Sequence, residues 1–253
     1  MISEQVIEAS IARSRAVTYR GTHLAFCIPN SLNHLRVHTF ATKEPETLEW
    51  IESIPEGAVL WDVGANVGLY SCYAARARRC RVIAFEPSVF NLELLARNVF
   101  LNQLTDKITI MSLPLFEQLT ENTLNMSGTS WGGALSAFGV LHGFDGHAMH
   151  KVFEFRTLGV SMDDAVKKLC LPRPDYIKMD VDGIEHLILR GGREVLDGVR
   201  GIIVEINDGF AVQADESKRL LEASGLRLVS KAHSAMIEES ATFNQTFNQI
   251  WVR

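Results

Sequence analysis

Apolar residues along the chain occur in short runs, and stretches with helical spacing separate most of these runs from one another. Strands that alternate with helices in this way are typical of βαβ units and a mainly parallel sheet. The runs are apolar throughout, as expected of strands that are buried on both faces. We expect strands at residues 59–61, 82–85, 108–111, 176–179, 201–205, 226–230 and 249–252. We expect helices at residues 68–79, 88–101, 162–169 and 183–190, and one that includes residues 220–223.

Two segments depart from this rhythm. Residues 1–45 are interpreted as a cap on a main domain that spans residues 46–253, and residues 117–157 as a loop-rich insertion that could serve as a substrate lid. In and beside the cap we expect a helix at 2–14, strands at 16–19, 24–28 and 35–40, and a helix at 46–54. The expected fold class is α/β, with a doubly wound, mainly parallel, seven-stranded Rossmann-like sheet, a small N-terminal cap and a loop-rich insertion.

Composition and charge argue against several classes of partner. The formal net charge is −5 and no extended basic stretch is visible, so a nucleic-acid partner is not expected. No apolar run approaches the roughly 20 residues that cross a bilayer, and the first residues lack the layout of a signal peptide. Four cysteines without a C-x-x-C pair favour free thiols, and we expect a cytoplasmic protein.

The turn after the first strand of the main domain carries the first candidate chemistry. Asp62 ends the apolar run, and two glycines then bracket a short segment that contains Ala65 and Asn66. Gly64 can adopt backbone angles that a side chain would forbid and leaves room for a ligand, while Gly68 allows the next helix to approach closely. In a doubly wound sheet, ligands bind where such a turn meets the carboxyl ends of neighbouring strands.

The next strand ends at Glu86, and Pro87 and Ser88 follow it. An acid in this position can accept hydrogen bonds from both hydroxyls of a ribose. A dinucleotide site would need a further glycine to admit a pyrophosphate, which weakens the alternative of an NAD-linked oxidoreductase. One glycine fewer, and an Asp62 that could accept from an ammonium group, favour S-adenosylmethionine. The plainer alternative is a tight turn without a ligand and a surface acid at Glu86.

Three segments together resemble the FkbM family of S-adenosylmethionine-dependent methyltransferases of class I. They are VLWDVGANVGLYS at 59–71, VIAFEPSVFNLELLARNVFLN at 82–102 and YIKMDVDGIEHLILRGG at 176–192. The family usually has glutamate where this chain has Asp182. The resemblance implies a methyltransferase fold with S-adenosylmethionine as cofactor. Residues 117–157 match the family poorly, and substrate identity is expected to depend on them.

The carboxyl ends of the strands at 176–179 and 201–205 supply candidates for catalysis. Asp180 is the first, as general base or as ligand of a cation that acidifies the acceptor hydroxyl, and Asp182 would assist it. Glu205 would orient the acceptor. His186 could be the base instead, because its ordinary pKa is the closest to neutrality. A cap, turn or surface role is the plainer alternative for each of them.

Oxygen ligands at these strand ends also suggest a metal site. Asp180, Glu205 and Asn207 together offer the ligands that Mg²⁺ or Ca²⁺ prefers, so a divalent cation is a second candidate cofactor. Three histidines that glycines separate are better explained by a solvated loop than by a metal site. They are His142, His147 and His150.

The expected function is O-methyl transfer from S-adenosylmethionine to a hydroxyl of a small molecule, either a sugar or a secondary-metabolite scaffold. The class of substrate follows from the family resemblance alone. One alternative is a non-catalytic, nucleoside-binding partner subunit. Another is a methyltransferase that acts on a protein or a lipid-linked acceptor.

Overall fold

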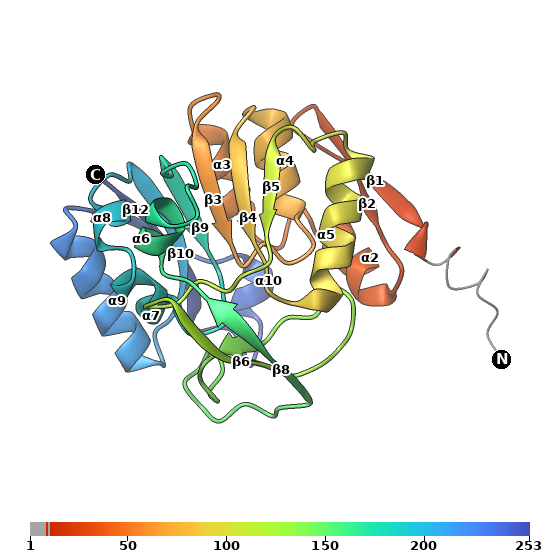
Figure 1. Cartoon of the computed structure of the whole chain (residues 1–253). Coiled ribbons are helices and arrows are strands. Elements are labelled where there is room, and N and C mark those ends of the chain that lie inside the picture. Colours follow the sequence, from red (N-terminus) through yellow and green to blue (C-terminus); the bar gives the residue numbers. More distant parts are fainter. Residues whose placement is uncertain (1–8, 10) are drawn as a thin grey trace.

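The computed structural model describes residue 9 and residues 11–253, and its helices flank a central sheet (Figure 1). Within the described residues the main sheet has seven strands in the order β11–β12–β10–β9–β3–β4–β5. Neighbouring strands are parallel except for β12, which runs antiparallel to both β10 and β11. The strands are β3 (Val59–Val63), β4 (Arg81–Phe85), β5 (Ile108–Met111), β9 (Tyr176–Met179), β10 (Gly201–Asn207), β11 (Arg227–Ala232) and β12 (Thr246–Val252). The mainly parallel, seven-stranded sheet that the sequence predicts is confirmed.

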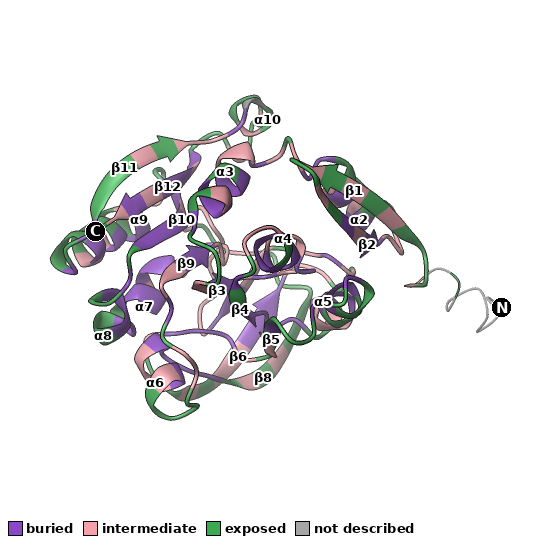
Figure 2. Ribbon diagram, turned by 90° about the horizontal axis from the view of Figure 1, so that it is seen from above, coloured by how far each residue is buried: buried purple, intermediate pink, exposed green. Residues whose placement is uncertain are grey.

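Alternate residues of the central strands point into two different cores, one on each face of the sheet. Trp61 and Ile83 pack on one face, whereas Leu60 and Val82 pack on the other. The first core is closed by α6 (Met162–Lys167), α7 (Glu185–Arg190), α8 (Arg193–Leu196) and α9 (Ala211–Ala223). The second is closed by α3 (Pro45–Ser53), α4 (Leu69–Ala77) and α5 (Val89–Leu101). Burial on both faces explains the continuous apolar runs, and Figure 2 shows buried residues gathered in these strands.

The N-terminal segment forms an antiparallel hairpin of β1 (Ser14–Tyr19) and β2 (Thr22–Cys27), followed by α2 (Ser31–His38). The expected hairpin is confirmed, and the helix expected over residues 2–14 lies for the most part outside the described residues. The division of the chain into a cap and a main domain between residues 45 and 46 stays a prediction. Val37, which precedes this boundary, packs in the same core as α4.

The prediction of a strand at residues 35–40 is wrong, because most of this segment belongs to helix α2. The Asn30 side chain accepts a hydrogen bond from the Asn33 backbone N–H at 2.9 Å and so begins the helix. Alternation of Leu35 and Val37 with polar residues resembles a strand, but the N-cap and tertiary packing decide for a helix.

The insertion contains a separate three-stranded sheet besides its loops. Its strands β6 (Thr120–Met126), β7 (Ser136–Phe138) and β8 (Phe153–Gly159) are antiparallel, with β6 in the middle. Leu124 and Phe138 are buried in the first core, so the insertion packs on the main sheet. Its role as a substrate lid stays a prediction.

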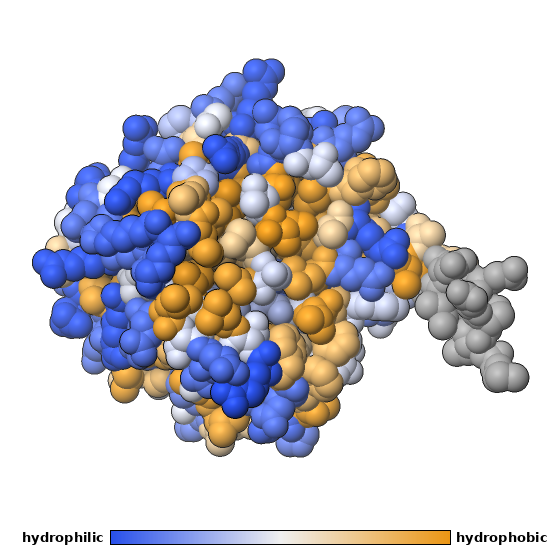
Figure 3. Space-filling model, viewed as in Figure 1, coloured by the Kyte–Doolittle hydropathy of each residue, from blue (hydrophilic) through white to orange (hydrophobic). Residues whose placement is uncertain are grey.

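Apolar side chains also reach the surface of the molecule. Figure 3 shows apolar residues across the middle of the face seen in Figure 1. Large exposed apolar side chains occur on α5 and β8, among them Val89, Phe100 and Phe153. None of the helices in the described part of the chain is long and apolar enough to cross a membrane.

The close approach of Gly64 to β9 generates a prediction on stability. At Gly64, where φ is +81°, an added Cβ would lie 1.8 Å from the Asp180 carbonyl oxygen. At Gly57, where φ is +77°, a Cβ would meet no atom within 4 Å. Both glycine-to-alanine changes incur the backbone penalty, but only Gly64→Ala also forces the two strand tips apart. We expect Gly64→Ala to lower the free energy of unfolding by at least about 2 kcal/mol more than Gly57→Ala in urea titrations. Equal losses in the two variants would contradict the role of this contact.

Candidate active site

A cavity of about 500 Å³ lies at the carboxyl ends of β3, β4, β9 and β10. Its size is in the range of small-molecule sites. The tips of these strands contribute Gly64, Glu86, Asp180 and Glu205 to the lining. Residues of α2, of the segment 133–138 and of the segment 236–243 complete the walls. The structure therefore brings these four candidates, which the sequence places at separate strand ends, together in one cavity.

The glycine turn after β3 is fixed by the end of β4. The backbone N–H groups of Gly64 and Ala65 both donate to the Phe85 carbonyl oxygen, at 3.0 and 2.9 Å. Ala65 and Asn66 line the cavity beside Gly64. Gly68 does not line it. A Cβ at Gly68 would lie 2.4 Å from a methyl carbon of the Leu95 side chain, so this glycine permits close packing of α4 on α5.

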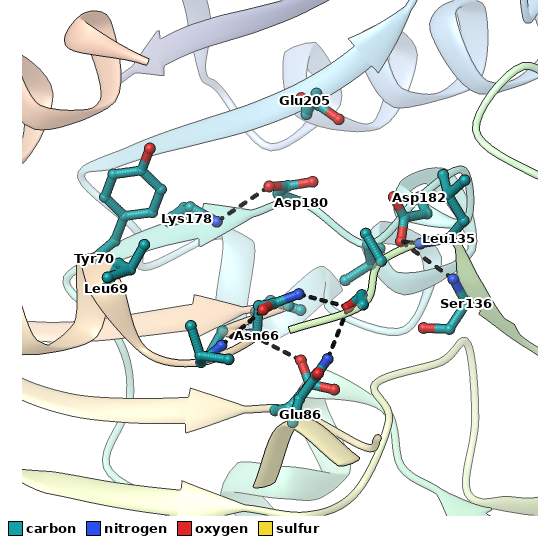
Figure 4. A pocket seen from close by; sticks show the side chains of 18 of the residues that line it. Asn66, Leu69, Tyr70, Glu86, Leu135, Ser136, Lys178, Asp180, Asp182 and Glu205 are labelled. Atoms are coloured by element: carbon teal, nitrogen blue, oxygen red, sulfur yellow. Dashed lines mark hydrogen bonds and ion pairs between the residues drawn. The ribbon is translucent and has the colours of Figure 1, made fainter. Parts of the chain in front are cut away.

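Glu86 is only 5% exposed and forms part of the cavity wall together with Pro87. One carboxylate oxygen accepts from the Asn66 N–H at 2.8 Å (Figure 4). The other accepts from the Ser88 N–H, also at 2.8 Å. Burial raises the pKa of Glu86 to about 7, although these N–H donors oppose the rise. The Asn91 side chain also hydrogen-bonds this carboxylate, and the lone pairs that remain can accept from a diol. Ser88 itself lies behind this wall and does not line the cavity.

Asp62 lies beneath the cavity and is 1% exposed. Its carboxylate accepts from the Ser71 hydroxyl at 2.5 Å and lies 3.5 Å from the Lys178 ammonium. The ammonium group beside Asp62 in this structure is therefore that of a lysine of the chain itself. A direct contact of Asp62 with a cofactor stays a prediction.

Lys178 connects Asp62 to the cavity floor. Its ammonium lies 3.6 Å from an Asp180 carboxylate oxygen and 5.4 Å from the centre of the Tyr70 ring (Figure 4). Burial opposes the charge of Lys178, but Asp62 and Asp180 more than offset it and hold its pKa above the ordinary value. The lysine thus holds the Asp180 carboxylate at the cavity, where a substrate can reach it.

Glu205 differs from the other carboxyl groups of the cavity. Asp180 is paired with Lys178 and Glu44 with Lys43, and Glu86 accepts backbone N–H groups. The Glu205 carboxyl has no hydrogen bond or ion pair with any other described residue. Burial raises its pKa well above the ordinary value, and the carboxylates of Asp180 and Glu44 add to the rise. An unpaired carboxyl in this position is available to a ligand.

Asp182 holds the insertion against the cavity. Its carboxylate accepts from the backbone N–H groups of Leu135 at 2.7 Å and Ser136 at 3.3 Å (Figure 4). Burial and the neighbouring Asp180 raise the pKa of Asp182 to about 6. Asp182 lines the cavity, so contact with a ligand is compatible with this role.

His186 does not reach the cavity. It is 4% exposed and its ring packs against Phe210, with the ring centres 5.8 Å apart. Burial lowers the pKa of His186 to about 4. The neighbouring Glu185 also points away from the cavity and accepts from the Val181 and Gly183 N–H groups at 2.9 and 3.1 Å.

The candidate cation ligands do not form one site. The Asn207 side chain accepts from the Gly209 N–H at 2.8 Å and does not line the cavity. The positive charge beside Asp180 is supplied by Lys178. No three His, Cys, Asp or Glu residues are grouped to hold a metal ion anywhere in residues 11–253. The donor set therefore does not fit a divalent cation, and no catalytic step is assigned to one.

Several residues of the cavity are absent from the candidates that the sequence provides. Lys178 lies two residues before Asp180, and the strand alternation that places both on one face could have identified it. Lys43, Glu44 and Asn91 carry no comparable local signal, because their place in the cavity depends on the fold of the whole chain.

Comparison with known proteins yields one family model and a group of related structures. Residues 62–228 match the family model described as the methyltransferase FkbM domain. The hexuronic acid methyltransferase AglP of Haloferax volcanii is 29% identical over 173 residues, which cover 68% of this chain and 65% of AglP. This chain thus spans slightly less than two thirds of AglP.

Two solved structures illustrate the similarity of fold. The methyltransferase FkbM of Methylobacillus flagellatus aligns with a TM-score of 0.57 and 14% identity, over 88% of this chain and 52% of that chain. Fibrillarin of Aeropyrum pernix, in complex with natively bound S-adenosyl-L-methionine, aligns with a TM-score of 0.50 and 12% identity, over 96% of this chain and 84% of that chain. At these identities the alignments speak for the fold alone.

The pKa of Glu86 generates a prediction on pH dependence. Its folded value of about 7 exceeds the ordinary 4.5, so the folded state binds more protons than the unfolded state between these values. The associated stability is present below pH 4.5 and is lost as the pH rises through 7. Glu86→Gln cannot ionise and lacks this loss. Between pH 5 and pH 8 the free energy of unfolding of wild type should therefore fall by up to about 3 kcal/mol relative to that of Glu86→Gln. Urea titrations at each pH test this, with the exposed Glu93→Gln as control, and a difference that does not change with pH would refute it.

Proposed function

We propose that this chain, which belongs to the FkbM methyltransferase family, transfers a methyl group from S-adenosylmethionine to a hydroxyl oxygen of a small molecule. Family membership confirms the resemblance that the three sequence segments carry. The observation that supports the reaction is a single cavity lined by Glu86 at the tip of β4 and by Asp180 at the tip of β9.

The donor half of the cavity consists of Glu86 with the turn after β3. Glu86 would accept the two ribose hydroxyls, because it lines the cavity and both of its oxygens are fixed by backbone N–H groups. Gly64 leaves the wall without a side chain where the turn reaches β9. When bound, S-adenosylmethionine supplies a sulfonium methyl that is already activated for displacement. The fold of fibrillarin, which binds this cofactor, supports the assignment.

The acceptor half consists of Asp180 and Glu205. Asp180 would accept the hydroxyl proton as the new oxygen–carbon bond forms, and Lys178 keeps its carboxylate oriented toward the cavity. Glu205, without a partner among the described residues, would hydrogen-bond the acceptor and orient it. Orientation of the acceptor oxygen toward the methyl carbon lowers the barrier by proximity alone. His186 has no part in this scheme, because it lies outside the cavity.

A sugar or sugar acid is a suitable first acceptor to test. AglP is named for hexuronic acid, and this chain is similar to AglP over 173 residues. A small molecule is favoured over nucleic acid because the chain has a net charge of −5.

Removal of the Glu86 carboxyl tests the donor site. Glu86→Ala loses the acceptor for both ribose hydroxyls, and we expect it to weaken binding of S-adenosylhomocysteine by about 10- to 100-fold, as measured by calorimetry. Glu93→Ala, on the same side of the sheet but exposed and paired with Arg97 on α5, should bind like wild type. An unchanged affinity in Glu86→Ala would remove the donor assignment.

Removal of the Asp180 charge tests the base. With methyl-labelled S-adenosylmethionine and a panel that includes D-glucose and D-glucuronic acid, Asp180→Asn should reduce label transfer by about 100-fold or more. Its affinity for S-adenosylhomocysteine should stay within a few-fold of wild type, because the donor half is intact. Transfer at the wild-type rate would exclude Asp180 as base. If the wild type binds the cofactor product but labels no hydroxyl compound, the non-catalytic alternative is favoured.

A further inference from the structure

One face of α2 and of the turn that follows it lines the cavity along its whole length. The lining residues are Leu32, Leu35, Arg36, Thr39, Phe40 and Lys43. Their spacing of three and four residues is that of one helix face. The chemistry changes along this face, from two leucines at the beginning of the helix to the ammonium group of Lys43 beyond its end.

A second apolar wall comes from the other end of the chain. Met236 and Ile237 belong to α10 (Ala235–Glu238), and Phe243 follows this helix before β12. These three residues and the two leucines of α2 form what we call the apolar rim of the cavity. Leu35 is 54% exposed and Met236 is 48% exposed, although both line the cavity. Large apolar side chains that converge on a cavity and remain exposed mark a surface that a ligand covers.

The apolar rim adjoins the acceptor half of the cavity on both sides. On the α2 side, the rings of Phe40 and Tyr70 stack with their centres 6.2 Å apart, and the Lys178 ammonium lies over the Tyr70 ring. On the α10 side, the chain leads from Phe243 to Thr246, which lines the cavity and pairs with Asn207, two residues beyond Glu205. A ligand that contacts Asp180 and Glu205 therefore has the apolar rim within the same cavity, past Phe40 on one side and past Thr246 on the other.

The two ends of this path require opposite chemistry. Asp180 and Glu205 form a floor that suits hydroxyl groups, and the Glu205 carboxyl has no hydrogen bond or ion pair within the described residues, although the charge of Lys43 attracts it. The rim consists of five apolar side chains. An acceptor that is polar on all sides would leave these side chains exposed to water. Coverage of this apolar surface by a ligand would favour binding.

We propose that the methyl acceptor is an amphiphile, with a hydroxylated head at Asp180 and Glu205 and an apolar arm that lies on the rim between α2 and α10. The proposal rests on the proposed function and deepens it. Leu35 and Met236 are then specificity-determining residues, because they are the most exposed part of the surface that receives the arm.

A matched pair of probes tests the arm. Methyl β-D-glucopyranoside and hexyl β-D-glucopyranoside share one head and differ by five methylenes, each of which favours binding when it is buried. Binding of each is measured by calorimetry below the micelle concentration, with and without S-adenosylhomocysteine. We expect the hexyl compound to bind wild type at least about tenfold more tightly.

Matched variants locate the preference on the rim. The double variant Leu35→Ser/Met236→Ser should lose most of the preference for the hexyl compound, with unchanged affinity for S-adenosylhomocysteine. Leu228→Ser removes a comparably exposed leucine (45%) that does not line the cavity, and it should keep the preference.

Three outcomes would overturn the proposal. The first is that wild type shows no preference for the hexyl compound, which includes no binding of either probe, and the second is that the preference survives in the double variant. The third is that wild type sediments as an oligomer and the double variant as a smaller species, which would make the rim an interface between copies. Failure of S-adenosylhomocysteine to bind wild type would instead count against the proposed function, and the ratio of the two probe affinities would still report on the rim.

Discussion

The buried ammonium of Lys178 determines how the tips of β3 and β9 meet. Removal of a charge from water costs several kcal/mol, and only well-placed opposite charges offset that cost. Asp62 on β3 and Asp180 beyond β9 provide them, at 3.5 and 3.6 Å. Loss of Lys178 would leave both carboxylates without this cation, whereas loss of one carboxylate leaves the ammonium with the other. The same junction admits Gly64, and no larger residue, against the Asp180 backbone.

Much of the main domain could be predicted from the sequence because its strands are buried on both faces. The runs at 108–111 and 176–179 coincide with β5 and β9, since continuous apolar segments between helices have few other interpretations. Helix α2 was missed because its apolar face is short and one side of it lines a cavity rather than a core. The local alternation then resembles a strand, and only the Asn30 cap and the fold of distant segments decide the outcome.

The part of the site that lies at the carboxyl ends of the parallel strands could be predicted from the sequence. Gly64, Glu86 and Asp180 line one cavity because parallel strands bring their carboxyl ends to the same edge of the sheet. Residue type alone does not say which way a side chain points, so Asp62 and His186 had the right chemistry but face the interior of the chain. The cavity walls from α2 and α10 could not be derived, since they depend on contacts between the two ends of the sequence.

The insertion shows how a segment can vary and still be held in place. Its carbonyl groups at Gly132 and Gly133 accept hydrogen bonds from Arg36, Asn66 and Asn91, and its N–H groups at Leu135 and Ser136 donate to Asp182. These bonds engage the backbone of the insertion between Gly132 and Ser136 and do not depend on the side chains there. Asn66 also donates its backbone N–H to Glu86, so the same residues organise the proposed donor site. The side chains at these positions can therefore change while the backbone bonds of the insertion still hold Asn66 beside Glu86.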